Sequence, residues 1–202
     1  MLQSKVYSRE ESQPLSDGLG LGLFIHDQDV YTGCVDLSVP VWDTHWKYGP
    51  WDQVIVLSGE DVPMDALKSS VHRLLEGSIW TVVSPPVPLD TSCDGIVALA
   101  LRGHFGFGTI PLILREEGCL AHLDVGLQDL TLRALSQLNP HVSVTAPSRV
   151  RRHRINLRPL IDRRGVLGMD VLFDDLDLAT QFIYGSSRVT GWTFRKDDSF
   201  GS

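Results

Sequence analysis

The sequence predicts a strand-rich α+β fold, with a mixed or antiparallel sheet and about three short helices. Short runs of β-branched and aromatic residues recur along the chain, among them LGLFIH, QVIVL and IWTVVS, and such runs are typical of strands. Helical spacing is rarer and is clearest at Met64, Leu67, Val71 and Leu74. With 202 residues, of which 43% are hydrophobic, the chain is long enough to bury a sizeable core. We expect a flexible N-terminal arm at 1–18 and one globular domain at 19–202, with the proline-rich segment 84–95 as the place where it would subdivide.

In the first half, strands near 20–26 and 30–37 are predicted to form a hairpin, and 53–57 is a short buried strand. A helix follows, with Asp61 as N-cap, Pro63 in its first turn and Gly77 at its end. Residues 79–84 are predicted as a strand, and the three prolines of 84–95 require a loop. The alternating glycines at 18–22 suggest bulges or tight turns rather than a phosphate loop, since a strand and not a helix follows them.

In the second half, 95–103 and 109–126 predict two or three strands with a hairpin turn at 116–118. A second helix is predicted at 127–138, ending at Asn139 and Pro140, and a strand at 141–145. The arginine-rich segment 149–158 is interpreted as an extended edge, with Arg152, Arg154 and Arg158 on one face and with Ile155 and Leu157 on a partly apolar underside. A strand at 165–173, a short helix starting at Asp174 and Asp175, and a strand at 188–196 complete the pattern.

The strongest functional signal is a cluster of seven arginines with Asp162 as the one acid among them. Guanidinium groups bind phosphates and carboxylates through paired hydrogen bonds. This segment is therefore the candidate anion-binding site, for RNA or DNA phosphates or for an acidic membrane surface. Its residues are Arg149, Arg151, Arg152, Arg154, Arg158, Arg163 and Arg164.

Other roles for the same arginines stay open. Charges on an edge strand prevent unwanted sheet pairing. The cluster could also pair with the downstream acids Asp170, Asp174, Asp175 and Asp177, within the chain or in a homo-oligomer. The formal net charge of -7 weakens long-range attraction to nucleic acid.

A second candidate is the aromatic segment 41–51, which contains Trp42, Trp46, Tyr48 and Trp51. Tryptophan and tyrosine are common anchors in protein interfaces, so these four residues are candidates for contact with a protein partner. The alternative is that they fasten a long loop to the core.

The competing functional class is a cysteine-dependent hydrolase that uses Cys93 or Cys119 with His104 or His122. In a strand, however, Cys119 and His122 would lie on opposite faces. No pattern of metal-ligand spacing is evident, and we expect neither a cofactor nor a metal.

No apolar stretch approaches the roughly 20 residues of a membrane helix, and the N-terminus lacks the apolar core of a signal peptide. Three widely spaced cysteines do not resemble a disulfide framework. We therefore expect an intracellular protein, cytoplasmic or nuclear, neither secreted nor transmembrane. The predicted function is a non-enzymatic interaction or assembly protein without catalytic residues, such as a viral structural or accessory protein. It would bind an anionic polymer or membrane surface and a protein partner, and it could form a homo-oligomer.

Overall fold

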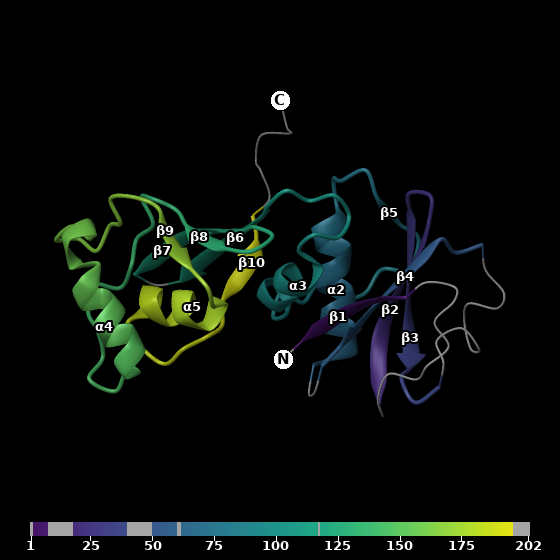
Figure 1. Ribbon diagram of the computed structural model, residues 1–202, viewed down its shortest axis with the longest axis horizontal. Helices are drawn as coiled ribbons and strands as arrows, with labels where there is room; N and C mark the ends of the chain where they lie inside the picture. Colours follow the sequence, from purple (N-terminus) through teal and green to yellow (C-terminus); the bar gives the residue numbers. More distant parts are fainter. Residues whose placement is uncertain (1, 8–17, 40–49, 60–61, 117, 196–202) are drawn as a thin grey trace. The chain divides into compact units, whose positions relative to one another are not determined.

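The computed structural model describes residues 2–7, 18–39, 50–59, 62–116 and 118–195. The chain divides into two compact units, residues 1–101 and 102–202. The proline-rich segment 84–95 lies inside the first unit. The described residues form two five-stranded sheets and four α-helices, so the strand-rich α+β class is confirmed (Figure 1). None of the helices in these ranges combines the length and the apolar character that crossing a membrane requires.

The first unit contains a sheet with the strand order β1-β4-β2-β3-β5. Its strands are β1 (Gln3–Tyr7), β2 (Leu19–His26), β3 (Asp29–Asp36), β4 (Gln53–Ser58) and β5 (Thr81–Val82). Strands β2 and β3 form the predicted antiparallel hairpin, and β5 lies parallel to β3. Residues 3–7, which we expected within a flexible arm, pair with β4 along the whole of β1. The rest of that segment, residues 8–17, lies outside the described residues.

The middle residues of β2 and β4, 20–25 and 54–57, are apolar or glycine and are buried on both faces of the sheet. One face carries a core cluster of Tyr7, Phe24, Val35, Leu37, Val54 and Val56. Gly22 makes room for it, since a Cβ there would lie 2.5 Å from the Val35 side chain and 2.7 Å from the Phe24 ring. The glycines at 20 and 22 lie inside a continuous strand ladder, which corrects the expectation of a bulge or tight turn at these positions.

Two helices complete the first unit, α2 (Met64–Leu75) and α3 (Asp94–Leu101). The α2 helix was predicted, and its apolar positions are buried. It begins at Met64 with Pro63 at the N-cap position rather than in the first turn, and Asp61, the predicted N-cap, lies outside the described residues. The α3 helix replaces the strand predicted at 95–103, and the fully buried Asp94 begins it. The Asp94 carboxylate forms an ion pair with Arg73 of α2 and accepts a hydrogen bond from the Ser70 hydroxyl at 2.8 Å. This buried contact joins the two helices.

The second unit contains an antiparallel sheet with the order β10-β6-β7-β8-β9. Its strands are β6 (Ile110–Glu116), β7 (Cys119–Val125), β8 (Leu130–Leu132), β9 (Val171–Phe173) and β10 (Trp192–Phe194). Helix α5 (Leu176–Tyr184) packs against β7 and β9, and α4 (Ser148–Asn156) packs against α5 (Figure 1). Asp175 caps the N-terminus of α5, as the predicted helix start required, by accepting hydrogen bonds from Asp177 N and Leu178 N.

Three predictions for the second unit are wrong. Residues 130–132 form strand β8 rather than part of a helix, because the alternation Leu130, Thr131, Leu132 also fits a strand and pairing with β7 decides between the two. Residues 141–145 form no strand. The arginine-rich segment 149–158 is not an extended edge but a helix followed by a 3-10 turn at Arg158–Leu160, which changes how its side chains are displayed.

Candidate anion-binding groove

Because residues 148–156 form helix α4, the arginines of the cluster project from it in several directions. Arginine is a good helix former, and the helix begins directly after Pro147, a residue that is well tolerated at such a start. Val150 and Arg154, four residues apart, are the buried positions of α4. The arginines at 149, 151 and 152 are exposed. The cluster is therefore divided between an internal arginine and a charged outer surface.

Arg154 is 7% exposed and stabilises the second unit from within. Its Nε donates to Phe182 O at 2.6 Å, and its Nη2 donates to Asn139 O at 2.9 Å and to Ile183 O at 3.0 Å. The guanidinium also lies over the Phe182 ring, 4.8 Å from its centroid. Phe182 and Ile183 belong to the last turn of α5, where carbonyls lack helical partners and the helix dipole favours a cation. Arg154 thus caps α5.

Two further arginines have partners in their own unit. Arg149 forms an ion pair with Asp175 at 2.9 Å and also donates to Gln181 Oε1. Arg158 donates to Ile161 O at 3.3 Å. The interpretation of the cluster as internally paired therefore holds for Arg149 and, with carbonyls in place of carboxylates, for Arg154. Of the acids considered as partners, Asp170 pairs instead with Arg133.

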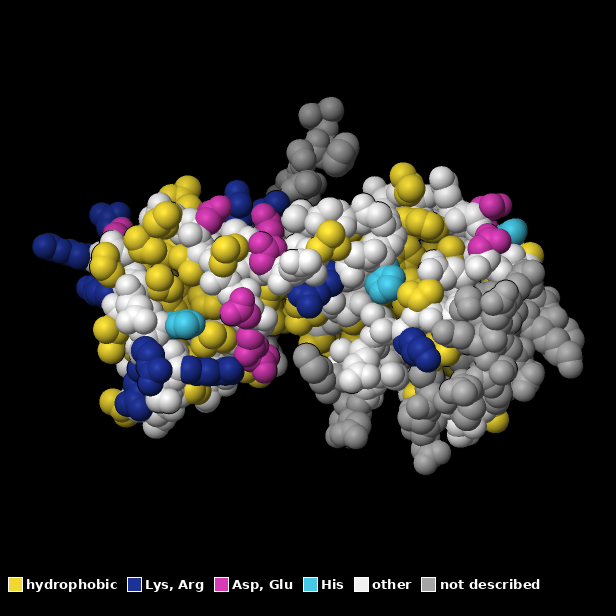
Figure 2. Space-filling model, in the orientation of Figure 1, with side chains coloured by type: hydrophobic (Ala, Val, Ile, Leu, Met, Phe, Trp, Pro, Cys, Tyr) yellow, Lys and Arg dark blue, Asp and Glu magenta, His cyan; other side chains and the backbone are white. Residues whose placement is uncertain are grey.

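The remaining four arginines are Arg151, Arg152, Arg163 and Arg164. All are exposed, and within the part of the chain that the structure describes their side chains form no ion pair. Figure 2 shows Lys and Arg side chains gathered at the end of the second unit that carries α4, with hydrophobic side chains between them.

A groove with a volume of about 560 Å³ lies beside α4. Arg151, Arg154 and Arg158 line it at helical spacing, and Arg163 lines it from the turn that follows. Its other lining residues come from 140–144, from α4 and from 161–165: Pro140, Val142, Ser143, Val144, Ile155, Ile161, Asp162 and Gly165. Arg149, Arg152 and Arg164 do not line it. The structure therefore brings four of the seven predicted arginines together around one concavity.

The electrostatics of the groove favour an anion. Burial lowers the pKa of Arg154 to about 10, and the nearby positive charge of Arg158 acts in the same direction, so the guanidinium stays protonated at neutral pH. Among the described residues Arg154 has no carboxylate partner. Asp162 is the one acid in the lining, and its Oδ1 already accepts hydrogen bonds from Arg164 N and Val166 N. The lining thus contains four arginines and one acidic residue.

The apolar part of the groove was not predicted from the sequence. Val142 and Val144 were assigned to a strand, whereas they lie in a loop and are 36% and 88% exposed. Ile155, which is 73% exposed, was placed on the apolar underside of an edge strand. The signal available in the sequence was the four-residue spacing of Arg151 and Ile155, which places both on one side of a helix.

The aromatic segment is described in part. Trp42, Trp46 and Tyr48 lie outside the described residues, and their predicted contact with a protein partner stays a prediction. Trp51 is half-buried and packs on the first sheet, with its ring 5.7 Å from Phe24 and 4.8 Å from Tyr31 between centroids. For Trp51 this packing supports the alternative that the segment is fastened to the core.

The geometry does not favour the cysteine-dependent hydrolase. Cys93 and Cys119 are buried, and burial raises the pKa of both thiols, which is the opposite of thiolate activation. Cys119 points into the core of the second unit and its thiol donates to Ile183 O, while His122 lies on the other face of β7. Cys93 contacts the Ser92 hydroxyl. In the described ranges no hydrogen bond joins either cysteine to a histidine.

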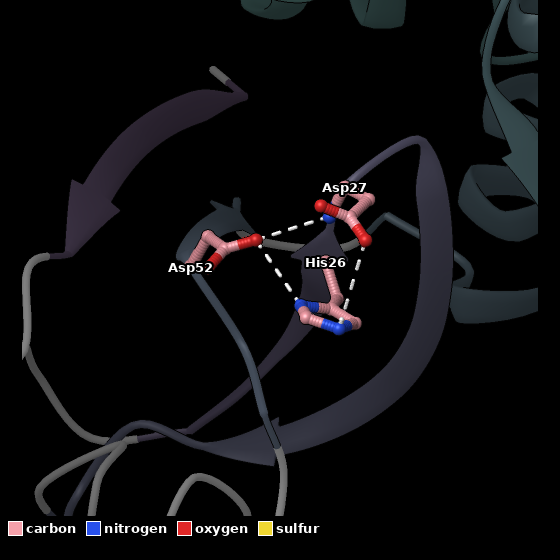
Figure 3. A group of neighbouring side chains, drawn as sticks. All are labelled: His26, Asp27 and Asp52. Carbon is pink, nitrogen blue, oxygen red and sulfur yellow. Dashed lines mark hydrogen bonds and ion pairs between the residues drawn. The ribbon is translucent and has the colours of Figure 1, made fainter.

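A His–Asp–Asp cluster lies at the end of the β2–β3 hairpin (Figure 3). His26 Nδ1 lies 3.2 Å from Asp52 Oδ2, and His26 Nε2 lies 3.9 Å from Asp27 Oδ2. Asp52 Oδ2 also accepts a hydrogen bond from Asp27 N at 3.0 Å. Both ring nitrogens therefore face carboxylates already, and the two aspartates are exposed. These contacts close the end of the hairpin without requiring a metal ion.

Comparison with family models, with curated proteins and with solved structures finds no match to this chain.

Proposed function

We propose that this protein is a non-enzymatic binding protein that takes up an anionic partner in the groove beside α4. The observation that carries the proposal is the set of guanidinium groups around one concavity. Arg151 and Arg163 form no ion pair among the described residues, and Arg154 is buried without a carboxylate partner. The carbonyls that Arg154 contacts offset part of the cost of burying its charge, but they carry no full counter-charge. A bound anion would supply that counter-charge.

Local charge supports the proposal despite the acidic total. The chain has a formal net charge of -7, but two of the acids downstream of the cluster already have partners. Asp175 pairs with Arg149 and caps α5, and Asp170 pairs with Arg133. Short-range, paired hydrogen bonds from arginine to an anion are effective even where the long-range field of the protein is unfavourable.

The test is charge reversal at one of two neighbouring arginines. Arg151 and Arg152 are adjacent exposed residues of α4, and Arg151 lines the groove while Arg152 does not. Arg151→Glu should weaken binding of an anionic probe by roughly tenfold to a hundredfold, since a hydrogen bond to a charged group is worth about 1.5–3 kcal/mol. Arg152→Glu makes the same change in net charge outside the groove and serves as the matched control.

The measurement is a titration of each variant, over a range of salt concentrations, with a single-stranded RNA, with phosphatidylserine vesicles and with polyglutamate. At least one probe should bind with an affinity that falls steeply as salt rises. That probe should lose more affinity with Arg151→Glu than with Arg152→Glu. Equal losses would mean that only net charge matters, and no binding at low salt would mean that the groove is not an anion site.

A further inference from the structure

The groove has an apolar component that a purely charged ligand would not need. Five of its lining residues are aliphatic or proline: Pro140, Val142, Val144, Ile155 and Ile161. Val144 and Ile155 are 88% and 73% exposed, so burying them under a ligand would remove substantial apolar surface from water. The ligand that fits this lining combines negative charge with apolar side chains.

The buried Arg154 determines where an acidic group of the ligand would bind. Of the three guanidinium nitrogens of Arg154, Nε and Nη2 donate to the carbonyls of residues 139, 182 and 183. Nη1 has no hydrogen bond among the described residues, and Arg154 lines the groove. A side chain that is more than nine-tenths buried and fixed by three hydrogen bonds holds this donor in a constant position. An acidic group in the groove would complete its hydrogen bonding.

The groove lacks the features that single-stranded nucleic acid and membranes select. Single-stranded RNA and DNA are bound by stacking bases on aromatic rings, and none of the lining residues is aromatic. Membrane-binding helices present a continuous apolar face to the lipid. In α4 three of the six exposed positions are arginine, two more are polar, and Ile155 is the one exposed aliphatic residue.

We infer, on the basis of the proposed function, that the partner is an acidic peptide segment of another protein in which aliphatic side chains lie next to carboxylates. Its carboxylates would contact Arg151, Arg154, Arg158 and Arg163, and its aliphatic side chain would pack on Ile155 and Val144. Arginine binds carboxylates in a planar, paired geometry. A groove of about 560 Å³ is of the size that holds a few side chains rather than a folded domain.

The experiment uses the full chain and two short labelled peptides of equal charge, one with leucines between glutamates and one with serines in place of the leucines. Fluorescence anisotropy gives the dissociation constant of each. The leucine peptide should bind about tenfold more tightly, since tenfold corresponds to about 1.4 kcal/mol, close to the lower end of what burying one leucine side chain contributes. Arg151→Glu should weaken both peptides, and Arg152→Glu should weaken neither to the same degree.

Ile155→Ser isolates the apolar contact. Because Ile155 is 73% exposed, the substitution should leave the fold intact, which circular dichroism checks. It should reduce the preference for leucine over serine while leaving the affinity of the serine peptide unchanged.

The outcomes separate the two proposals. Equal affinity for the two peptides, or a preference that Ile155→Ser does not change, overturns the peptide inference. Tighter binding of a single-stranded RNA or of phosphatidylserine vesicles, still lost with Arg151→Glu, also overturns it but leaves the proposed anion-binding function standing. No Arg151-dependent binding of any of these probes overturns both.

Discussion

Replacing Arg154 by methionine should destabilise the second unit, although arginine clusters are usually regarded as surface features. Methionine keeps much of the length and apolar volume of the side chain but removes the donors to Asn139 O, Phe182 O and Ile183 O. At about 1.5 kcal/mol each, the lower bound for hydrogen bonds from a charged group, three bonds amount to roughly 4–5 kcal/mol. Part of this is regained because the buried cation no longer has to be desolvated. We expect a net loss of about 3 kcal/mol.

Hydrogen exchange measured by mass spectrometry tests this loss of stability in α5, the helix that Arg154 caps. A loss of about 3 kcal/mol should accelerate exchange of the most protected amides of α5 roughly a hundredfold. Arg152→Met is the matched control, since Arg152 is exposed on the same helix, and it should change stability by less than about 0.5 kcal/mol. Arg154→Lys should restore only part of the protection, because an ammonium group cannot reproduce the planar donor geometry. Equal exchange in the Arg154→Met and Arg152→Met proteins would refute the assignment of Arg154 as the cap of α5.

Three further predictions concern stability and reactivity. Asp94→Ala should destabilise the first unit by about 3–5 kcal/mol in urea unfolding, because it leaves a partly buried guanidinium without its carboxylate; a change below 1 kcal/mol, on the order of an exposed ion pair, would contradict this. With a thiol reagent at neutral pH the exposed Cys34 should react quickly and the buried Cys93 and Cys119 slowly; a second fast thiol would instead favour the hydrolase. Burial, with the charge of Lys68, lowers the pKa of His72 below 6.5. The contribution of His72 to stability is therefore present above pH 6.5 and is lost as pH falls toward its pKa in the folded protein. His72→Gln should flatten this part of the pH–stability curve, and an unchanged curve would exclude the effect.

The sequence predicted elements well where local pattern and burial agree. The β2–β3 hairpin, β4, α2, the β6–β7 hairpin and the capped start of α5 follow from alternation, helical spacing and N-cap chemistry. Short apolar runs without a clear period were ambiguous, which is why α3 was predicted as a strand. The length of such a run, eight residues in α3, fits either structure, and packing against α2 decided it.

The candidate site was predicted in composition but not in geometry. The arginines were identified, yet their extended interpretation placed Arg152 and Arg154 together, whereas the helix buries Arg154 and turns Arg152 away from the groove. The partners of Arg154 are carbonyls near residues 139 and 182, remote in the sequence. Backbone acceptors of this kind carry no side-chain signal, so no local pattern could have revealed them.

The most direct test of anion binding in the groove is an NMR titration that follows the arginine Nε–H resonances while the glutamate–leucine peptide is added. The proposed function predicts that the signals of Arg151, Arg158 and Arg163 shift and saturate together. The signals of Arg133 and Arg188, which are held in ion pairs with Asp170 and Glu116, should stay in place. Shifts spread evenly over all exposed arginines, or absent from the groove, would contradict the central claim.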